Sequence, residues 1–353
     1  MRRRVVRRNA GICGDFGLER IVGHGVLSEF PGQTWYACGL TGRNDMTALP
    51  TEIRRALDQI RRDVRRHGLW QPGDRVLLAC SGGRDSMAAL ALLDALRPSL
   101  GHTLAVAHVD HGLQANRRET AELVAREAAR RQLPCVIRQV DVKLGADLEA
   151  RARTARYEAL DTSRLELAAD CLATAHHADD QAETVLLRLA RGAGPDAHAG
   201  VRRTRDGAIV RPLLALTRAQ LAQCAAHFAT PWLSDPSNDD LAMTRNHLRH
   251  AVLPALERAI PGAAAGLARS AAIAAAQEGA LAAWIDRALG DRLEIDVTAR
   301  VARVHAADLP DMPAAKSALL QLLCRRLGVP APSQRAVARG WRSARRVRRI
   351  CTG

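Results

Sequence analysis

The chain has 353 residues, 47% of them hydrophobic and 3% aromatic, which is enough for one α/β domain with a buried core and a smaller second domain. Its formal net charge of +15 indicates a polyanionic partner such as nucleic acid, or an acidic membrane surface. No run approaches the roughly 20 apolar residues that span a bilayer, and the basic start lacks the apolar stretch of a signal peptide, which argues against a membrane protein.

The cysteines and the first 45 residues carry little structural signal. The eight cysteines form no CxxC pair and no short-spaced disulfide pattern, which argues against metal ligation by cysteine and favours a reducing compartment, the cytoplasm. Residues 1–45 follow neither a strand nor a helix period, so we expect a disordered or wrongly assigned extension; an arginine-rich arm that touches RNA is the alternative for residues 1–8. An amphipathic helical pattern begins just after Met46, which is therefore a candidate start.

Strand-like and helical patterns alternate after residue 74. The predicted strands are 75–80, 103–109, 134–140 and 171–175, and helices are predicted from Asp85, near 116–131, near 147–168 and at 180–191. This alternation predicts an α/β domain over residues 46–255, with a mostly parallel sheet covered by helices on both faces. Ligands are then expected at the carboxyl ends of the strands.

The pattern becomes helical after IVRPLL at 209–214, and an alanine-rich stretch at 262–289 predicts a connecting helix. Residues 256–332 are expected to form a smaller helical domain that binds the substrate. Residues 333–353 are basic and aperiodic, with no sign of a folded C-terminal domain. Much of the positive charge lies at the two ends, since residues 1–45 carry +3 and residues 335–353 carry +7, which leaves +5 for 46–334.

The sharpest motif is SGGRDS, which stands between a predicted strand and a predicted helix. Its glycines allow successive backbone N–H groups to face an anion at the start of the helix. Asp85 would repel phosphates unless a cation intervened, so the loop predicts ATP with Mg²⁺. The loop lacks the lysine of a Walker A motif, and an ordinary capped glycine turn is the alternative interpretation.

Polar side chains follow the other predicted strands. HVDHGL at 108–113 places His108, Asp110 and His111 at the same sheet edge, although it lacks a clear fourth ligand for zinc. In LEARARTARY at 148–157, Arg153 and Arg156 share a helix face, where they can hold a phosphate or simply face solvent.

Two later motifs add charged groups. In TAHHADDQAE, His176 and Asp180 are four residues apart and can serve as acid/base or Mg²⁺ groups; capping of the helix by Asp179 and Asp180 is the alternative. Arg245 and Arg249 follow the polar turn DPSNDD and can clamp a phosphate as bidentate donors, or form an ordinary surface face.

SGGRDS resembles the SGGxDS signature of the pyrophosphate-loop ATPases. Together with the four later motifs, in this order and over residues 70–330, it closely resembles the tRNA(Ile)-lysidine synthases. The resemblance implies an adenine nucleotide α-hydrolase-like fold of the pyrophosphate-loop type. It also implies that ATP adenylates C2 of the wobble cytidine in the CAU anticodon of tRNA(Ile), after which the ε-amine of L-lysine displaces AMP.

The resemblance also implies roles for particular residues. Asp85, His176 and Asp180 are expected to be catalytic, with Asp85 and Asp180 organising Mg²⁺. Relatives of this kind commonly form homodimers. ATP is expected to bind Ser81, Gly82, Gly83, Arg84, Asp85 and Ser86. Substrate, tRNA or adenylate is expected to contact His111, Arg153, Arg156, Arg245 and Arg249.

Two other functions stay open at this point. Another pyrophosphate-loop enzyme, such as a tRNA thiolase, would use cysteines for sulfur transfer, and the missing CxxC argues against it. A truncated paralogue that binds RNA without turnover would fit the arginine-rich tail, whereas the intact SGGRDS and HHADD argue against it. The chain also departs from the family pattern at Gln114, where a basic residue is common, and in DAHAGV at 196–201.

Overall fold

The computed structural model describes residues 49–329, except for 111, 113–115, 142–144, 146–147, 193–197, 206, 236–239 and 311. The expectations for residues 1–45, for His111 and Gln114, and for the tail 333–353 therefore lie outside the described residues.

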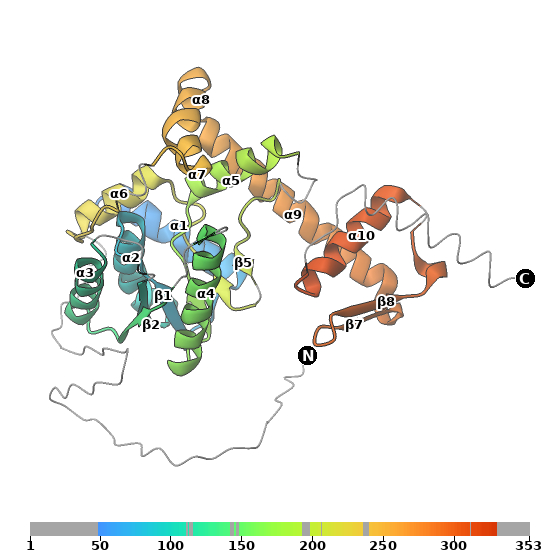
Figure 1. Cartoon of the computed structure of the whole chain (residues 1–353), viewed down its shortest axis with the longest axis horizontal. Helices are drawn as coiled ribbons and strands as arrows, with labels where there is room; N and C mark the ends of the chain where they lie inside the picture. The colour runs from blue at the N-terminus through green and yellow to red at the C-terminus, as the bar shows by residue number, and fades with distance from the viewer. Residues whose placement is uncertain are drawn as a thin grey trace, which may run out of the picture.

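A six-stranded sheet forms the centre of the larger part of the molecule (Figure 1). The strand order is β3-β2-β1-β4-β6-β5, and every neighbouring pair is parallel except β5 and β6. The predicted mostly parallel α/β sheet is confirmed. Its strands are β1 Arg75–Ala79, β2 Thr103–Asp110, β3 Cys135–Gln139, β4 Cys171–Ala173, β5 Thr204–Arg205 and β6 Ile209–Val210.

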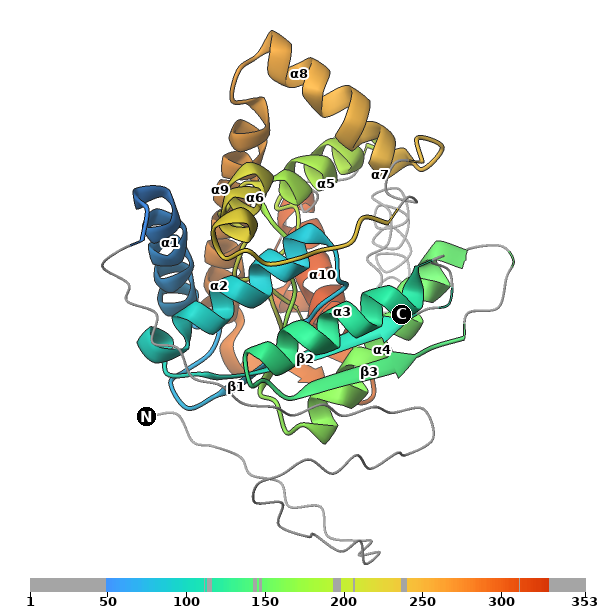
Figure 2. The ribbon, with the colours of Figure 1, turned by 90° about the vertical axis from the view of Figure 1, so that its left-hand side faces the viewer.

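Helices cover both faces of this sheet, as predicted (Figures 1 and 2). Alternate residues of β1 point to opposite faces, so Val76 and Leu78 lie in one buried cluster and Leu77 lies in another. The first cluster includes residues of α1 Thr51–His67, α2 Arg84–Leu100, α3 Arg117–Arg130 and α6 Arg218–His227. The second cluster includes Leu160 of α4 Leu148–Glu166.

A helical region follows the sheet and leads to a small C-terminal unit (Figure 1). α5 Ala178–Ala190 packs against the long α9 Ala263–Leu289, and α9 extends to the small unit. Between them along the chain lie α7 Thr244–His247, a π-helical turn Leu248–Val252 and α8 Leu253–Ala259.

The small unit combines the end of α9 with β7 Leu293–Asp296, β8 Val301–Val304 and α10 Pro313–Arg326. Ile285, Leu289, Leu319 and Leu322 form its buried cluster. The expected helical C-terminal region is present, and the β7–β8 hairpin is an addition to it. The hairpin follows the alternation of apolar and polar residues in LEID, a signal too short to stand out beside an alanine-rich helix.

Among the residues described, no single helix has the length and apolarity to cross a membrane. The stretches Thr244–Ala259 and Ala263–Arg292 meet these criteria only as a pair, and the pair is bent by 98°.

The packing of α1 onto the sheet domain can be tested at Leu57. Its side chain is fully buried beside Ile60 and Val64, so Leu57→Ala leaves a cavity in the larger core. We expect the free energy of unfolding to fall by about 2–5 kcal/mol in urea denaturation. Arg55→Ala, an exposed position on the same helix, should change it by less than about 0.5 kcal/mol. Equal effects of the two substitutions would contradict the packing of α1.

Candidate active site at the carboxyl edge of the sheet

The SGGRDS loop connects β1 to α2 and is closed by its own serines. Ser86 Oγ accepts a hydrogen bond from the backbone N–H of Ser81 at 3.1 Å and donates one to the carbonyl oxygen of Gly83 at 2.9 Å. Gly82 has a φ of +79°, and a Cβ placed there would lie 2.3 Å from Cγ2 of Thr120. Only glycine therefore fits at this point of the loop.

His177 stands at the start of α5 among three carboxylates. Its Nε2 lies 3.4 Å from Oδ2 of Asp85 and 3.5 Å from Oδ2 of Asp180, and its Nδ1 lies 3.6 Å from Oδ2 of Asp179. The backbone N–H of His177 also donates to Asp180 Oδ2 at 2.9 Å, which caps the helix. This histidine therefore joins the SGGRDS segment to the first turn of α5.

The opposite charges in this cluster stabilise the ionised form of each group. Burial alone would lower the pKa of His177, but its contacts with Asp179, Asp85 and Asp180 raise the pKa to about 9. Burial alone would raise the pKa values of Asp85, Asp179 and Asp180, but each falls below its ordinary value because of the nearby cations, His177 above all. At neutral pH an imidazolium thus lies among three carboxylates.

Arg245 and Arg249 extend this network toward α8. Arg245, on α7, donates to Glu183 at 2.7 Å and to Asp180 at 2.9 Å. Arg249, on the π-helical turn, donates to Glu183 at 2.6 Å and to Asp180 at 3.2 Å. These two arginines, which were predicted to contact substrate, are paired with acidic side chains of α5.

The other predicted residues lie around this network. His176 Nδ1 lies 2.8 Å from the hydroxyl of Thr174, and burial lowers the pKa of His176 to about 3 despite the nearby Asp180 charge. Arg153 and Arg156 lie on α4, with their guanidinium carbons 5.4 and 5.6 Å from the ring centre of Tyr157. The structure thus brings Asp85, Asp180, Arg245 and Arg249 around one centre, and it places Arg153 and Arg156 around Tyr157.

Sequence reasoning gave no role to His177 or Arg218 and only a capping role to Asp179. Arg218 begins α6, and its backbone N–H donates to Asp179 Oδ2 at 2.8 Å while its Nε lies 3.9 Å from Asp85 Oδ2. The doubled histidine and doubled aspartate of HHADD were the sequence feature that pointed to this cluster. The four-residue spacing between His176 and Asp180 favoured His176 as the catalytic histidine, whereas in the structure its neighbour His177, the N-cap residue of α5, lies among the carboxylates.

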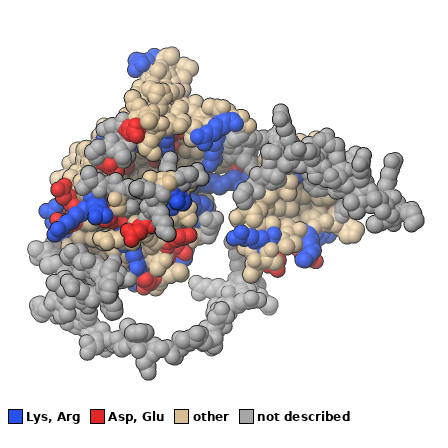
Figure 3. Space-filling view, in the orientation of Figure 1, with Lys and Arg blue, Asp and Glu red and all other residues tan. Residues whose placement is uncertain are grey.

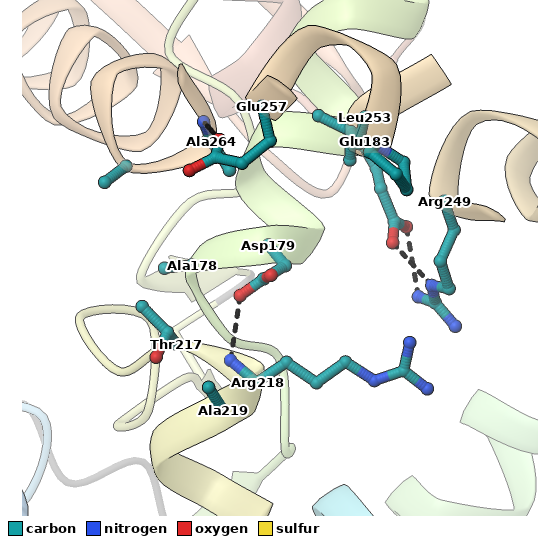
Figure 4. Close-up of a pocket in the computed structure, with 12 residues that line it drawn as sticks. Ala178, Asp179, Glu183, Thr217, Arg218, Ala219, Arg249, Leu253, Glu257 and Ala264 are labelled. Atoms are coloured by element: carbon teal, nitrogen blue, oxygen red, sulfur yellow. Dashed lines mark hydrogen bonds and ion pairs between the residues drawn. The ribbon is translucent and has the colours of Figure 1, made fainter. Parts of the chain in front are cut away.

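A cavity of about 360 Å³ opens beside this cluster, between α5, α6, α8 and the start of α9 (Figure 4). Its charged lining is mixed: Asp179, Glu183 and Glu257 are acidic, and Arg218 and Arg249 are basic. Leu253, Pro254 and several alanines supply the apolar wall. Such a lining suits a small ligand that carries both ammonium and carboxylate groups.

The described residues contain no group of three or more His, Cys, Asp or Glu side chains that could hold a metal ion by themselves. Mg²⁺ differs from zinc in this respect, because it keeps several waters and is usually held by one or two carboxylates together with substrate phosphates. The side chain of Asp85, within SGGRDS, is 26% exposed, which suits that mode of binding. Asp180 is occupied by Arg245, Arg249 and the backbone of His177.

The charge of His177 gives a test of the network. Because its pKa in the folded chain is raised above the ordinary 6.5, the stability it contributes is complete below about pH 6.5 and is lost as the pH rises through about 9. We expect the stability difference between the wild type and His177→Gln to shrink by about 2–3 kcal/mol over this range in urea denaturation. His227→Gln, an exposed histidine on α6, should keep the pH dependence of the wild type. A constant difference for His177→Gln would show that the imidazolium is not stabilised by its neighbours.

Known proteins resemble this chain in sequence and in fold. Residues 49–256, more than half of the chain, match the family model of the PP-loop domain. A tRNA(Ile)-lysidine synthase of Azoarcus sp. is 39% identical over 281 residues, which is 77% of this chain and 60% of that protein. A tRNA(Ile)-lysidine synthase of Salinispora tropica is 41% identical over 301 residues, covering 80% of this chain and 88% of that protein.

Among solved structures, the U34-tRNA thiolase NcsA from Methanococcus maripaludis is similar, with a TM-score of 0.52 at 17% identity. The likeness covers 62% of this chain and 77% of the thiolase, and it supports the fold alone. The chain spans only part of some relatives, since its match to the lysidine synthase of Geobacter sulfurreducens covers 54% of that protein. The family match and the identity across most of the Salinispora protein nevertheless establish that this chain belongs to the tRNA(Ile)-lysidine synthases of the PP-loop family.

Proposed function

We propose that the chain joins L-lysine to C2 of the wobble cytidine in the CAU anticodon of tRNA(Ile), using ATP. The O2 oxygen of the cytidine attacks the α-phosphate and pyrophosphate leaves; the ε-amine of lysine then attacks C2 and AMP leaves. The modified base pairs with A rather than G. One observation carries the proposal. The SGGRDS loop, the carboxylate cluster around His177, and the cavity lined by both acidic and basic side chains lie next to one another at the carboxyl edge of the sheet.

The loop supports the first half of the reaction. Its glycines and the start of α2 turn backbone N–H groups toward an anion, which suits the β- and γ-phosphates of ATP. Arg84 and Arg218 lie within 4.0 Å of Asp85, so positive charge borders the place where pyrophosphate would leave. Mg²⁺, held by Asp85 and phosphate oxygens, would neutralise charge on the phosphates; Asp180, the second predicted ligand, would first have to release an arginine.

The cavity beside His177 supports the second half. Asp179 and Glu257 suit the two ammonium groups of lysine, and Arg218 suits the α-carboxylate. The ε-ammonium has a pKa of about 10.4 in water and must lose a proton before it attacks. We propose His176 as the acceptor because it is neutral; its low pKa makes it a weak base, so desolvation of the amine must also contribute.

The function is tested with transcripts of tRNA(Ile) carrying CAU and of initiator methionine tRNA, each incubated with protein, ATP, Mg²⁺ and lysine. We expect lysidine by nucleoside mass analysis in the isoleucine transcript alone. Gly82→Ala should abolish its formation, because the added Cβ meets Thr120 and alanine disfavours a φ of +79°.

Two other results would each contradict the proposal. Release of pyrophosphate without lysidine would identify another tRNA-modifying enzyme with the same loop, such as a thiolase. Absence of both products from a chain that still binds RNA would identify an inactive paralogue.

The lysine site is tested separately at Glu257, which lines the cavity away from the loop. We expect Glu257→Gln to raise the KM for lysine about threefold to tenfold, since it removes one carboxylate from the lining, while pyrophosphate release without lysine stays unchanged. Glu52→Gln, at an exposed position on α1, is the matched control. Because Glu257 also accepts hydrogen bonds from the N–H groups of Gly262 and Ala264, thermal melts of each variant should accompany the kinetics. An unchanged KM would place lysine elsewhere.

A further inference from the structure

Arginines follow the outward face of α1, opposite the side chains that pack into the core. Arg55, Arg62 and Arg66 stand seven and four residues apart, so they share one face of the helix, and all three are exposed. We call these three residues the arginine stripe; at the rise of an α-helix it is about 16 Å long. Leu57 and Val64 lie on the opposite, buried face. The arginine stripe therefore points away from the core into solvent.

The acidic side chains of α1 do not neutralise the arginine stripe. Asp58 pairs with Arg61 at 2.8 Å, and the buried Asp63 pairs with Arg203 from the segment before β5. Within the residues that the structure describes, no carboxylate forms an ion pair with a member of the stripe. The face of α1 that meets solvent therefore carries an excess of positive charge.

The end of α1 shows the effect of this charge. Burial lowers the pKa of His67, and the positive charges of Arg203 and Arg66 lower it further, against the opposing effect of Asp63. A proton is thus disfavoured at this end of the helix because cations already lie there. The same potential favours an anionic partner.

Other exposed helices of the chain carry balanced charges. On α3, Arg118 pairs with Glu122 at 3.0 Å, and Arg130 pairs with Glu127 at 3.0 Å. Such alternation of sign is the usual pattern of a helix face that only meets solvent. The arginine stripe departs from this pattern, which distinguishes it from an ordinary solvated face.

The arginine stripe lies on a different side of the molecule from α4. Leu57 and Leu160 belong to different core clusters, so α1 and α4 pack on opposite faces of the sheet. α1 lies behind the sheet in Figure 1 and at the left of Figure 2. Its last turn reaches the amino edge of the sheet, where Arg65 donates to the carbonyl oxygen of Ser99 near the end of α2. The catalytic centre lies at the carboxyl edge.

The arginines around Tyr157 belong instead to the active site. Burial would raise the pKa of the tyrosine hydroxyl, but Arg153, Arg211 and Arg156 lower it. Arg153 and Arg211 also contribute to lowering the pKa of His176. The face of the sheet domain that carries α4 shows basic and acidic side chains next to one another (Figure 3). The arginine stripe of α1 is therefore a separate basic surface.

We propose that the arginine stripe of α1 contacts the phosphate backbone of a double-helical part of the tRNA substrate outside the anticodon arm. The identification of the partner as tRNA rests on the proposed function. The wobble base has to reach the carboxyl edge of the sheet, so a surface behind the sheet meets a different part of the same RNA. Guanidinium groups can bind phosphates of an RNA helix without reading its bases, which suits a contact far from the reacting base.

An anionic membrane is the other polyanion that a basic helix can meet. A helix that lies on a membrane buries its apolar face among the lipids. The apolar face of α1 is already in the protein core, where Leu57, Ile60 and Val64 are at most 1% exposed. Only charge would hold this helix on a membrane, so RNA is the partner that the surface fits better.

The test measures the binding of two RNAs to the full chain by fluorescence anisotropy over a range of salt concentrations. One is a full-length tRNA(Ile) transcript with a CAU anticodon, and the other is its anticodon stem-loop alone. We expect the triple variant Arg55→Gln, Arg62→Gln and Arg66→Gln to bind the full-length transcript about tenfold more weakly, with a salt dependence lower by about three charges. Binding of the stem-loop and of ATP should stay unchanged. In lysidine formation, the KM for tRNA should rise while kcat is kept.

Arg126→Gln is the matched control, since it removes an exposed arginine of α3 on the same face of the sheet. It should leave binding of the full-length transcript unchanged. The three arginines of the stripe are exposed and glutamine is a good helix former, so the variants should fold.

Four results would overturn the proposal. The first is an unchanged affinity of the triple variant for the full-length transcript. The second is an equal loss for the stem-loop, and the third is a loss per arginine no greater than that of Arg126→Gln, since either would reduce the effect to net charge. The fourth is weaker binding to vesicles of phosphatidylcholine and phosphatidylserine with unchanged binding of RNA, which would assign the stripe to a membrane.

The surface and the proposed function can fail separately. If the wild type binds the transcript through the arginine stripe but forms no lysidine, the proposed function fails while the surface stands. If lysidine forms and the triple variant binds the transcript as the wild type does, the function stands and the surface fails.

Discussion

The structure of the site depends on one interaction, the buried imidazolium of His177 among Asp85, Asp179 and Asp180. Asp85 lies in the first turn of α2, which follows β1, and the other two aspartates belong to α5, which follows β4. These strands are neighbours in the sheet, so their carboxyl ends bring together residues almost a hundred positions apart in sequence. Without a cation at His177, only the arginines at the edge of the cluster would offset the mutual repulsion of these three carboxylates.

A second set of ion pairs attaches α7 and the π-helical turn to α5. Arg245 and Arg249 pair with Asp180 and Glu183, and Glu183 is almost completely buried. Removing either buried carboxylate would leave Arg245 and Arg249 to share the remaining one, so that two guanidinium groups would face a single negative charge. The π-helical turn that carries Arg249 lies at the same place, and such turns are frequent at functional sites.

Sequence patterns predicted the fold well because its signals are local. The buried runs at β1 and β2, and the glycines after β1, occur within windows of a few residues and need no partner to be recognised. The site was harder to predict, because which of two adjacent histidines meets Asp85 depends on the N-cap geometry of α5. Arg211 was missed for a similar reason: it follows an apolar strand, and only the fold brings it to Tyr157 from a different segment.

Ion pairing divides the arginines near the site into two groups that the sequence alone does not distinguish. Arg245 and Arg249 have buried acidic partners, so contact with a phosphate would require those pairs to break, at a cost that one phosphate contact hardly offsets. Among the described residues, Arg153, Arg156 and Arg211 form no ion pair with a carboxylate, and the side chains of Arg156 and Arg211 hydrogen-bond to Tyr157 instead. The pairing of each arginine, rather than the total charge of +15, therefore decides which cations can accept an anionic ligand.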